Sequence, residues 1–456
     1  MKIKLTFAIL ICKSVRTILR VLKRGGTALP GKIALKVCPD MLEELARGVD
    51  TVVVTGTNGK TTTSRIIEQA FTESGQKYVA NRSGANLITG ITTEFAMNAD
   101  LAGRPRAKIA VIECDEAASK AVLGYIRPKV VLVTNLFRDQ LDRFGEITHT
   151  LDSIKEGISK TPGSILCLNA DDSLVASIAS EVPNEVVFYG LDAETCPDRL
   201  PEQSDAPHCI RCKTEYEYDW HSYGHLGGFR CPNCGYSRQN PQVYAAKVLA
   251  RDADSTTVEM DIDGRGMQVH INLPAIYNVY NAVGAAAALT RMGFSPEQAV
   301  RAAENFSCGF GRMEKFALGN TTLRMILVKN PAGCNQVMNY LSALSGGFTM
   351  AIGLNDNIAD GTDISWIWDA EFEKLVPISD RLSEILVFGK RRAAMALRLK
   401  YAGIDMEKVK MYEDYEQLIK DMGERNEPVF IMPTYTSMLE LRSHLSRICG
   451  EKEFWE

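Results

Sequence analysis

The chain has 456 residues, about three times the length of an average domain, so two or three domains are expected. Hydrophobic residues make up 45% and charged residues 24%, a composition that excludes intrinsic disorder and collagen-like or coiled-coil chains. The 52 Lys and Arg against 56 Asp and Glu give a formal net charge of -4, so the chain has no overall basic field to attract nucleic acid.

The N-terminal segment, residues 2–24, combines an apolar stretch at residues 5–12 with flanking Lys and Arg. The stretch is shorter than the ~20 residues that a membrane-spanning helix needs, and no small-residue cleavage site follows it. The segment therefore predicts an amphipathic helix. A peripheral contact of its basic face with an anionic membrane surface stays open as an alternative.

Short apolar runs rich in β-branched residues alternate with helix-length segments up to residue 190. This alternation predicts a mostly parallel, doubly wound α/β sheet. The expected strands are 51–55, 108–112, 130–134, 165–168 and 186–189, with antiparallel strands within 243–262 and 267–273 and helices at 278–292 and 296–305. Between residues 195 and 242 no helical or strand period is evident, so this stretch is expected to be an inserted module.

A second α/β pattern begins near Gly311 and predicts a Rossmann-like C-terminal domain. Its expected strands are 323–328, 349–353, 385–388 and 428–432. The expected domains are therefore 1–310, with an insertion at about 196–242, and 311–456.

The strand at 51–55 runs into a glycine-containing loop that opens a helix, the context of a phosphate-binding loop. The loop residues are Thr55, Gly56, Thr57, Asn58, Gly59, Lys60, Thr61 and Thr62. Successive backbone N–H groups would bind phosphate oxygens, Lys60 would supply positive charge, and the Thr61 hydroxyl would ligate Mg²⁺. The full P-loop pattern would place a glycine at Val54, so this loop is a variant.

Two C-x2-C pairs, Cys209 with Cys212 and Cys231 with Cys234, are separated by 18 residues. This spacing predicts a zinc ribbon, and its four thiolates leave no open position for a reactive water, so the expected role of Zn²⁺ is structural. Nearby His208, His221 and His225 are expected to be exposed to solvent. The other eight cysteines are scattered singly, which favours a reducing compartment.

An acid-rich segment follows the expected strand at 348–354. Residues 355–369 contain Asp356, Asp360, Asp363 and Asp369 together with two Trp. Loops beyond the carboxyl ends of parallel strands are where α/β domains place ligands and catalytic groups. A plain Asx-turn with Trp packed beneath it is the alternative.

The string TGTNGKTTT at 55–63 resembles the ATP loop of the Mur ligases and folylpolyglutamate synthetases. Four further segments resemble that family in chain order: VIECDE at 111–116, NLFRDQLDRFG at 135–145, YNVYNA at 277–282 and GRME at 311–314. The resemblance implies that Glu113 ligates Mg²⁺, that Asn278 and Asn281 face the nucleotide, and that Arg312 reaches phosphate. Gln140 stands where the family has His, so no role of that imidazole is carried over.

The strings KNPAG at 329–333 and LNDNIADGTDISWIWD at 354–369 closely resemble the MurT family, synthetase subunits of lipid II isoglutaminyl synthase that share the four-cysteine insertion. The resemblance implies a heterodimer with a GatD-like glutaminase, whose Cys–His site Asp363 would complete. The catalytic residues expected from it are Asp363, Lys60 and Glu113. The choice among Asp356, Asp360 and Asp363 rests on motif alignment.

This resemblance also implies a reaction. ATP would activate the D-glutamate α-carboxylate of the lipid II stem peptide as an acyl phosphate, and ammonia from the glutaminase would convert it into D-isoglutamine. The implied cofactors are ATP, Mg²⁺ and Zn²⁺, and the implied location is the cytoplasm, with association with the inner face of the membrane left open. Two alternatives are a standalone amino-acid ligase and a zinc-ribbon nucleic-acid-binding ATPase, the latter disfavoured by the net charge of -4.

Overall fold

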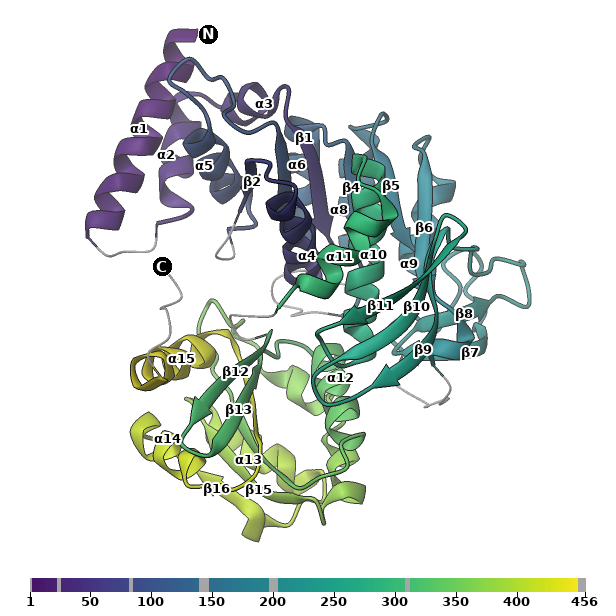
Figure 1. Cartoon of the computed structure of the whole chain (residues 1–456), viewed down its shortest axis with the longest axis vertical. Helices are drawn as coiled ribbons and strands as arrows, with labels where there is room; N and C mark the ends of the chain where they lie inside the picture. Colours follow the sequence, from purple (N-terminus) through teal and green to yellow (C-terminus); the bar gives the residue numbers. More distant parts are fainter. Residues whose placement is uncertain are drawn as a thin grey trace. The chain divides into compact units, whose positions relative to one another are not determined.

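The computed structural model describes residues 2–22, 26–81, 85–138, 147–196, 204–307 and 312–449. The chain forms two compact units (Figure 1). The first comprises Met1–Phe137 and Ile147–Phe306, and the second comprises Ser307–Glu456 together with Arg138–Glu146. The domain boundary predicted between residues 310 and 311 lies outside the described residues.

A large sheet forms the centre of the first unit. Among the described residues its strand order is β11-β10-β9-β6-β5-β4-β1-β3-β2. Strand β10 runs antiparallel to both of its neighbours, β9 and β11, and the other neighbouring pairs are parallel. Its strands are β1 (Asp50–Thr55), β2 (Tyr78–Ala80), β3 (Ile109–Glu113), β4 (Val130–Val133), β5 (Ile165–Asn169), β6 (Val186–Leu191), β9 (Val243–Arg251), β10 (Thr256–Ile262) and β11 (Arg265–Ile271). Strands covered on both faces are apolar throughout, which is why β1 and β4 were recognisable from sequence.

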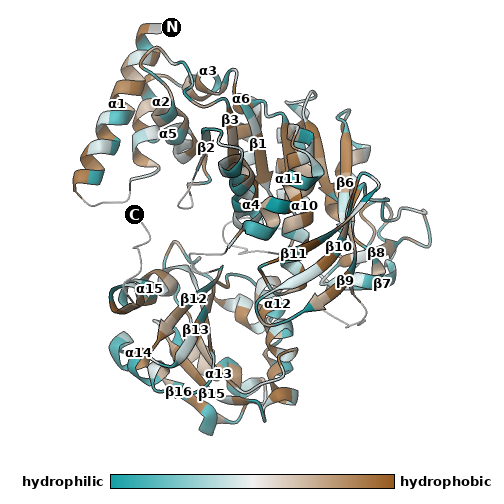
Figure 2. Cartoon of the chain, viewed as in Figure 1, coloured by the Kyte–Doolittle hydropathy of each residue, from teal (hydrophilic) through white to brown (hydrophobic). Residues whose placement is uncertain are grey.

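Helices cover both faces of this sheet. The described helices of the first unit are α1 (Lys2–Val21), α2 (Leu29–Val37), α3 (Met41–Ala46), α4 (Lys60–Glu73), α5 (Ile88–Asn98), α6 (Glu116–Ile126), α8 (Ile147–Ser159), α9 (Ser173–Ser177), α10 (Ile276–Met292) and α11 (Pro296–Asn305). Helices α4, α10 and α11 pack together on one face, and α6 and α8 lie on the other (Figure 1). Figure 2 shows the hydrophobic strands, among them β1 and β6, that these helices cover.

The insertion between β6 and β9 contains a β-hairpin, β7 (Glu217–Tyr223) and β8 (Leu226–Arg230). The sequence shows no strand period there, so these two strands were not predicted. Register shifts on either side of His221 disturb the alternation of apolar and polar residues that identifies a strand in sequence. The module has a small core, shared with Ala176 of α9, in which Phe229 packs against Tyr216 and Tyr236 with ring centroids 5.3 and 5.4 Å away.

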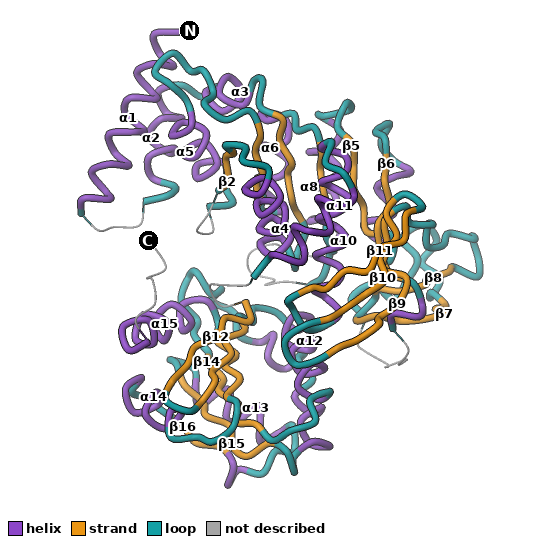
Figure 3. The backbone as a smooth tube through the Cα atoms, in the orientation of Figure 1, coloured by secondary structure: helices purple, strands orange, loops and turns teal. Residues whose placement is uncertain are grey.

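The second unit is built on a second sheet, with the described order β12-β13-β17-β14-β15-β16. Its strands are β12 (Arg312–Leu318), β13 (Thr321–Ile326), β14 (Phe348–Gly353), β15 (Leu382–Phe388), β16 (Val409–Met411) and β17 (Val429–Pro433), and its α-helices are α12 (Pro331–Ser342), α13 (Arg392–Tyr401), α14 (Tyr415–Gly423) and α15 (Tyr435–Cys449) (Figure 3). All neighbours run parallel except β12 and β13. This is the Rossmann-like arrangement predicted from sequence, with the edge strands β12 and β16 added.

No helix in the described part of the chain combines the length and the apolar character that crossing a bilayer requires.

Candidate functional site

The glycine loop predicted to bind phosphate connects β1 to α4. Gly56 and Gly59 have φ angles of +117° and +88°, a region that favours glycine. A Cβ on Gly56 would lie 2.4 Å from Thr134 Oγ1, and one on Gly59 would lie 2.2 Å from Asn281 Oδ1. Both glycines are therefore required by the backbone conformation and by the close approach of neighbouring segments. Thr57 and Thr62 are buried beside them.

The segment after β4 holds this loop in place through Asn135. Thr57 N donates to Asn135 O at 2.8 Å, and Asn58 N donates to Asn135 Oδ1 at 2.9 Å. Asn135 Nδ2 donates in return to Asn58 O at 3.1 Å. Asn135 opens the family-like segment recognised in the sequence, but its bracing role was not predicted. The loop is thus ordered by the protein's own hydrogen bonds.

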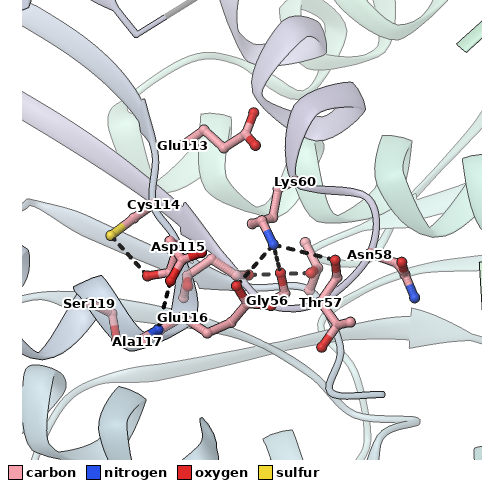
Figure 4. Close-up of polar contacts among 12 residues, drawn as sticks. Gly56, Thr57, Asn58, Lys60, Glu113, Cys114, Asp115, Glu116, Ala117 and Ser119 are labelled. Carbon is pink, nitrogen blue, oxygen red and sulfur yellow. Dashed lines mark hydrogen bonds and ion pairs between the residues drawn. The ribbon is translucent and has the colours of Figure 1, made fainter. Parts of the chain in front are cut away.

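Lys60, the first residue of α4, forms a buried ion pair with Glu116, the first residue of α6 (Figure 4). Its Nζ lies 3.1 Å from Glu116 Oε2, and the two side chains are only 9% and 5% exposed. The ammonium also donates to the carbonyl oxygens of Gly56 and Thr57. Breaking a buried pair leaves an uncompensated charge, so Glu116 holds the ammonium at the loop. Sequence reasoning missed this role of Glu116.

Glu113 ends β3 and faces Thr61, whose Oγ1 donates to Glu113 Oε2 at 2.8 Å. Asn81 fixes the backbone of Glu113 from both sides: Glu113 N donates to Asn81 Oδ1 at 2.8 Å, and Asn81 Nδ2 donates to Glu113 O at 2.7 Å. A carboxylate beside a hydroxyl at a phosphate loop is the oxygen donor set that Mg²⁺ takes in nucleotide sites, so these residues fit the ion. The part played by Asn81 has no local sequence signal.

The asparagines assigned to the nucleotide lie in the first turns of α10, and both are buried. Asn281 Nδ2 donates to Asn278 Oδ1 at 3.2 Å, and Thr63 Oγ1 donates to Asn281 Oδ1 at 3.4 Å. The first unit therefore brings the glycine loop, Glu113 and the two asparagines together. Arg312 begins β12 in the second unit, so its contact with phosphate stays a prediction.

The four cysteine thiols of the insertion converge, with all their sulfurs within 4.8 Å of one another. Cys209 Sγ lies 3.6 Å from Cys234 Sγ, and Cys212 Sγ lies 3.4 Å from Cys231 Sγ. A tetrahedral Zn²⁺ with bonds of about 2.3 Å spaces its sulfurs roughly 3.8 Å apart, so the cluster fits this ion. Hydrogen bonding with the Thr214 hydroxyl and backbone lowers the pKa of the Cys212 thiol to about 5, which favours the thiolate form that metals bind.

The tip of the β7–β8 hairpin packs beside the glycine loop. Tyr223 stacks on Phe137 with ring centroids 5.5 Å apart, and the His225 ring lies 4.6 Å from the same Phe137. Phe137 N donates to Thr57 Oγ1 at 3.1 Å, so the contact reaches the phosphate loop. We had expected His225 to be exposed, but it is fully buried, with Nε2 3.4 Å from Asp172 Oδ1. The hairpin folds back on the sheet, which local sequence does not reveal.

The acid-rich segment after β14 places its carboxylates in different surroundings. Asp356 Oδ2 accepts from Arg391 Nε at 2.6 Å. Asp360 is 5% exposed and accepts from Thr436 N at 2.7 Å, so it ties the loop to α15. Asp363 is half-buried, and its two oxygens accept from Ser365 N and Ser365 Oγ at 2.8 and 2.9 Å. The assignment of Asp363 to a partner's site stays a prediction.

Residues 139–145 of the family-like segment 135–145, among them Gln140, lie outside the described residues.

Comparison with known proteins adds to this geometry. The "Mur ligase middle domain" family matches residues 54–226, and the "MurT ligase C-terminal" family matches residues 327–438. Subunit MurT of the glutamine-hydrolyzing lipid II isoglutaminyl synthase of Streptococcus pneumoniae is 34% identical over 449 residues, 98% of each chain. The protein of the same name from Staphylococcus aureus is 35% identical over 448 residues, 96% of this chain and 97% of its own.

Solved structures agree on the fold. A pseudomurein peptide ligase type C from Methanothermus fervidus superposes with a TM-score of 0.66 at 21% identity, covering 91% of this chain and 84% of its own. MurF from Acinetobacter baumannii gives a TM-score of 0.67 at 16% identity, covering 91% and 80%. Both show a Mur ligase-like fold. Because the relatives above 30% identity extend over nearly the whole length, the chain belongs to the MurT family of Mur ligase-like enzymes.

Proposed function

We propose that the chain is the synthetase subunit of a lipid II isoglutaminyl synthase, an ATP-dependent carbon–nitrogen ligase. It would convert the α-carboxylate of D-glutamate in the lipid II stem peptide into the amide of D-isoglutamine. The observation that carries this proposal is the similarity to relatives of that name along almost the entire chain, at 34–35% identity. The phosphate loop supports it, because amide formation from a carboxylate needs activation of that carboxylate, and phosphoryl transfer from ATP can supply it.

The glycine loop at 55–62, together with Glu113 and Glu116, forms what we call the phosphate cradle. Its residues are suited to binding the triphosphate of ATP. Backbone N–H groups at the start of α4 and the positive end of its dipole favour phosphate oxygens. Lys60 is held at the loop by Glu116, so its ammonium is in place before the nucleotide arrives. In this proposal phosphate oxygens replace the loop carbonyls as partners of Lys60, while Glu116 keeps the side chain oriented. A fixed cation in a buried site stabilises charge that develops on the transferred γ-phosphoryl group.

Glu113 and Thr61 would hold Mg²⁺. The bound ion would neutralise negative charge on the phosphates of ATP. Asn81 contributes by fixing the backbone from which Glu113 extends. Cys209, Cys212, Cys231 and Cys234 would hold Zn²⁺, whose contribution is to the folding of the module, since a four-thiolate site is closed to substrate.

The proposed chemistry has two steps. A carboxylate oxygen of the substrate attacks the γ-phosphorus of ATP, the bond to the bridging oxygen of ADP breaks, and an acyl phosphate forms. The nitrogen of ammonia then attacks the acyl carbon, phosphate leaves with the carboxylate oxygen, and the nitrogen loses a proton to give the amide. Activation is needed because an oxygen of a free carboxylate is too poor a leaving group to be displaced by ammonia.

Ammonia would come from a GatD-like glutaminase in a heterodimer with this chain. Burial raises the pKa of the Cys114, Cys167 and Cys334 thiols, which makes them poor nucleophiles for glutamine hydrolysis within this chain. The half-buried carboxylate of Asp363 is proposed to orient and charge-stabilise the partner's imidazole. Its bonds to Ser365 hold both oxygens in a fixed direction.

The test is reconstitution of the chain with a glutaminase subunit and lipid II. Glutamine or ammonium should each support amide formation, with one ADP and one phosphate released per amide. Turnover with a free amino acid in place of ammonia would instead identify a standalone ligase, and salt-sensitive binding of nucleic acid without amidation would point to the ATPase alternative.

A further inference from the structure

Helix α1 has two apolar faces, of which one is covered. Leu5, Ala8, Ile9 and Cys12 are buried where α1 packs on α2 and α5. The opposite side carries large apolar side chains that are exposed: Ile3 87%, Phe7 56%, Leu10 48%, Ile18 57% and Val21 78%. Their spacing of four, three, eight and three residues keeps them on one side of a helix. We define these five residues as the outer face of α1.

The segment that carries the outer face is rich in positive charge. Residues 1–39 contain nine of the 52 Lys and Arg and none of the 56 Asp and Glu, so the rest of the chain is net acidic. Lys4 and Arg20 are exposed on α1, and Lys32 is exposed on α2. Two other cations serve the fold instead, because Lys13 Nζ donates to Ala99 O and Arg16 pairs with Glu94.

Figure 1 places α1 at the border of the first unit, with α2 and α5 on its covered side, and Figure 2 shows the hydrophobic turns along it. At 20 residues α1 is about 30 Å long, and it is not apolar enough to span a bilayer. A helix with an apolar face beside cations, and without acids, has the composition of helices that lie in the plane of a membrane surface.

We propose that the outer face of α1 docks on an anionic lipid bilayer, with its apolar side chains in the interfacial region and its cations at lipid headgroups. A second copy of the chain is a poorer occupant, because pairing two such faces brings like charges together. The inference rests on the proposed function in one respect: a lipid-linked substrate is presented at a bilayer surface. Docking would convert a search in three dimensions into one along that surface.

The test is co-sedimentation of the complete chain with vesicles of phosphatidylglycerol and phosphatidylcholine. The chain should bind the mixed vesicles and should lose most of this binding at high salt. Its binding to neutral phosphatidylcholine vesicles should be weaker by at least about tenfold. The variant Phe7→Gln/Ile18→Gln should weaken binding about tenfold or more. A matched control is Leu249→Gln/Leu397→Gln, which removes two other large apolar side chains that are 45% and 48% exposed and should bind as the parent does.

Sedimentation velocity and thermal unfolding of the outer-face variant complete the experiment, since exposed positions should leave the fold and the monomer unchanged. Equal vesicle binding by parent and outer-face variant, or a dimer in the parent that the variant abolishes, would overturn the proposal. Amidation of detergent-dispersed substrate should be the same in both proteins. Failure of amidation in both, with vesicle binding intact, would refute the proposed function and leave the docking surface standing.

Discussion

The phosphate cradle of the first unit and the acid-rich loop of the second each follow a β-strand. They differ in how far their side chains are held by partners within the chain. In the cradle, Lys60 is already paired with Glu116, and Asn135 braces the loop from the neighbouring segment. In the acid-rich loop, Asp360 is used to tie the loop down, while Asp363 is half-buried and is held by Ser365. In the proposed function the first site has its chemistry within the chain, whereas the second would present the Asp363 carboxylate to a partner protein.

The largest expected effect comes from breaking the cradle. Lys60→Ala should lower amidation about 10³–10⁵-fold with glutamine and with ammonium alike, because a cation on the transferred phosphoryl group serves both. Product formation from both nitrogen sources is the measurement. The single variant leaves Glu116 buried without its partner, so Lys60→Met/Glu116→Gln is the control. It should regain thermal stability without activity, and recovery of turnover would remove Lys60 from the mechanism.

The next effect separates the two regions. Asp363→Asn should reduce glutamine-driven amidation about 10²–10⁴-fold, because an amide does not stabilise the charged imidazole, and should leave ammonium-driven amidation unchanged. The ratio of the two rates is the measurement. The matched control is Asp356→Asn, which lies in the same loop as Asp363 and removes the ion pair with Arg391. It should not change that ratio. Equal loss with both nitrogen sources would assign Asp363 to the synthetase reaction.

A smaller effect sharpens the description of the cradle. Asn81→Ala removes both hydrogen bonds that fix the Glu113 backbone, so the Mg²⁺ concentration for half-maximal turnover should rise about tenfold. A magnesium titration at saturating ATP measures it. Because the change acts through Glu113, excess Mg²⁺ should restore most of the rate. A loss that no Mg²⁺ concentration repairs would show that Asn81 has another role.

The smallest effect on turnover is expected from the four-cysteine module. Treatment with a zinc chelator, or the variant Cys209→Ser/Cys231→Ser, should unfold the hairpin and raise the Kd for ATP several-fold. Tyr223 and His225 would then no longer support Phe137 beside Thr57. Calorimetric titration with ATP and hydrogen exchange over residues 204–237 measure both. The ratio between nitrogen sources should not move, and unchanged protection of the hairpin without metal would contradict this account of the module.

The sequence was informative wherever the signal is local. The glycine loop, the paired C-x2-C strings and the buried parallel strands each lie within a few consecutive residues, and the resemblance to known families rests on the same strings. Three contacts of the cradle join residues that are far apart in sequence, and they therefore depend on how the strands are ordered in the sheet. The separation is 56 positions for Lys60 and Glu116, 77 for Asn58 and Asn135, and 32 for Asn81 and Glu113. An acid that opens the helix after the Glu113 strand is the one signal that could have indicated Glu116.

The hairpin shows the other limit of sequence reasoning. Register shifts around His221 disturb the strand period, and the burial of His225 arises because the hairpin tip folds against Phe137. Neither feature is encoded in a short motif. The module consequently looked like an isolated metal-binding insertion, although its tip contacts the segment that braces the phosphate loop.

The most direct measurement of the central claim follows an oxygen atom. Lipid II labelled with ¹⁸O in the α-carboxylate of its D-glutamate is amidated by the reconstituted complex with ATP, and the released phosphate is analysed by mass spectrometry. Activation as an acyl phosphate predicts one ¹⁸O in each phosphate formed, because the attacking oxygen leaves with phosphorus. Amide formation accompanied by unlabelled phosphate, or without consumption of ATP, would contradict it.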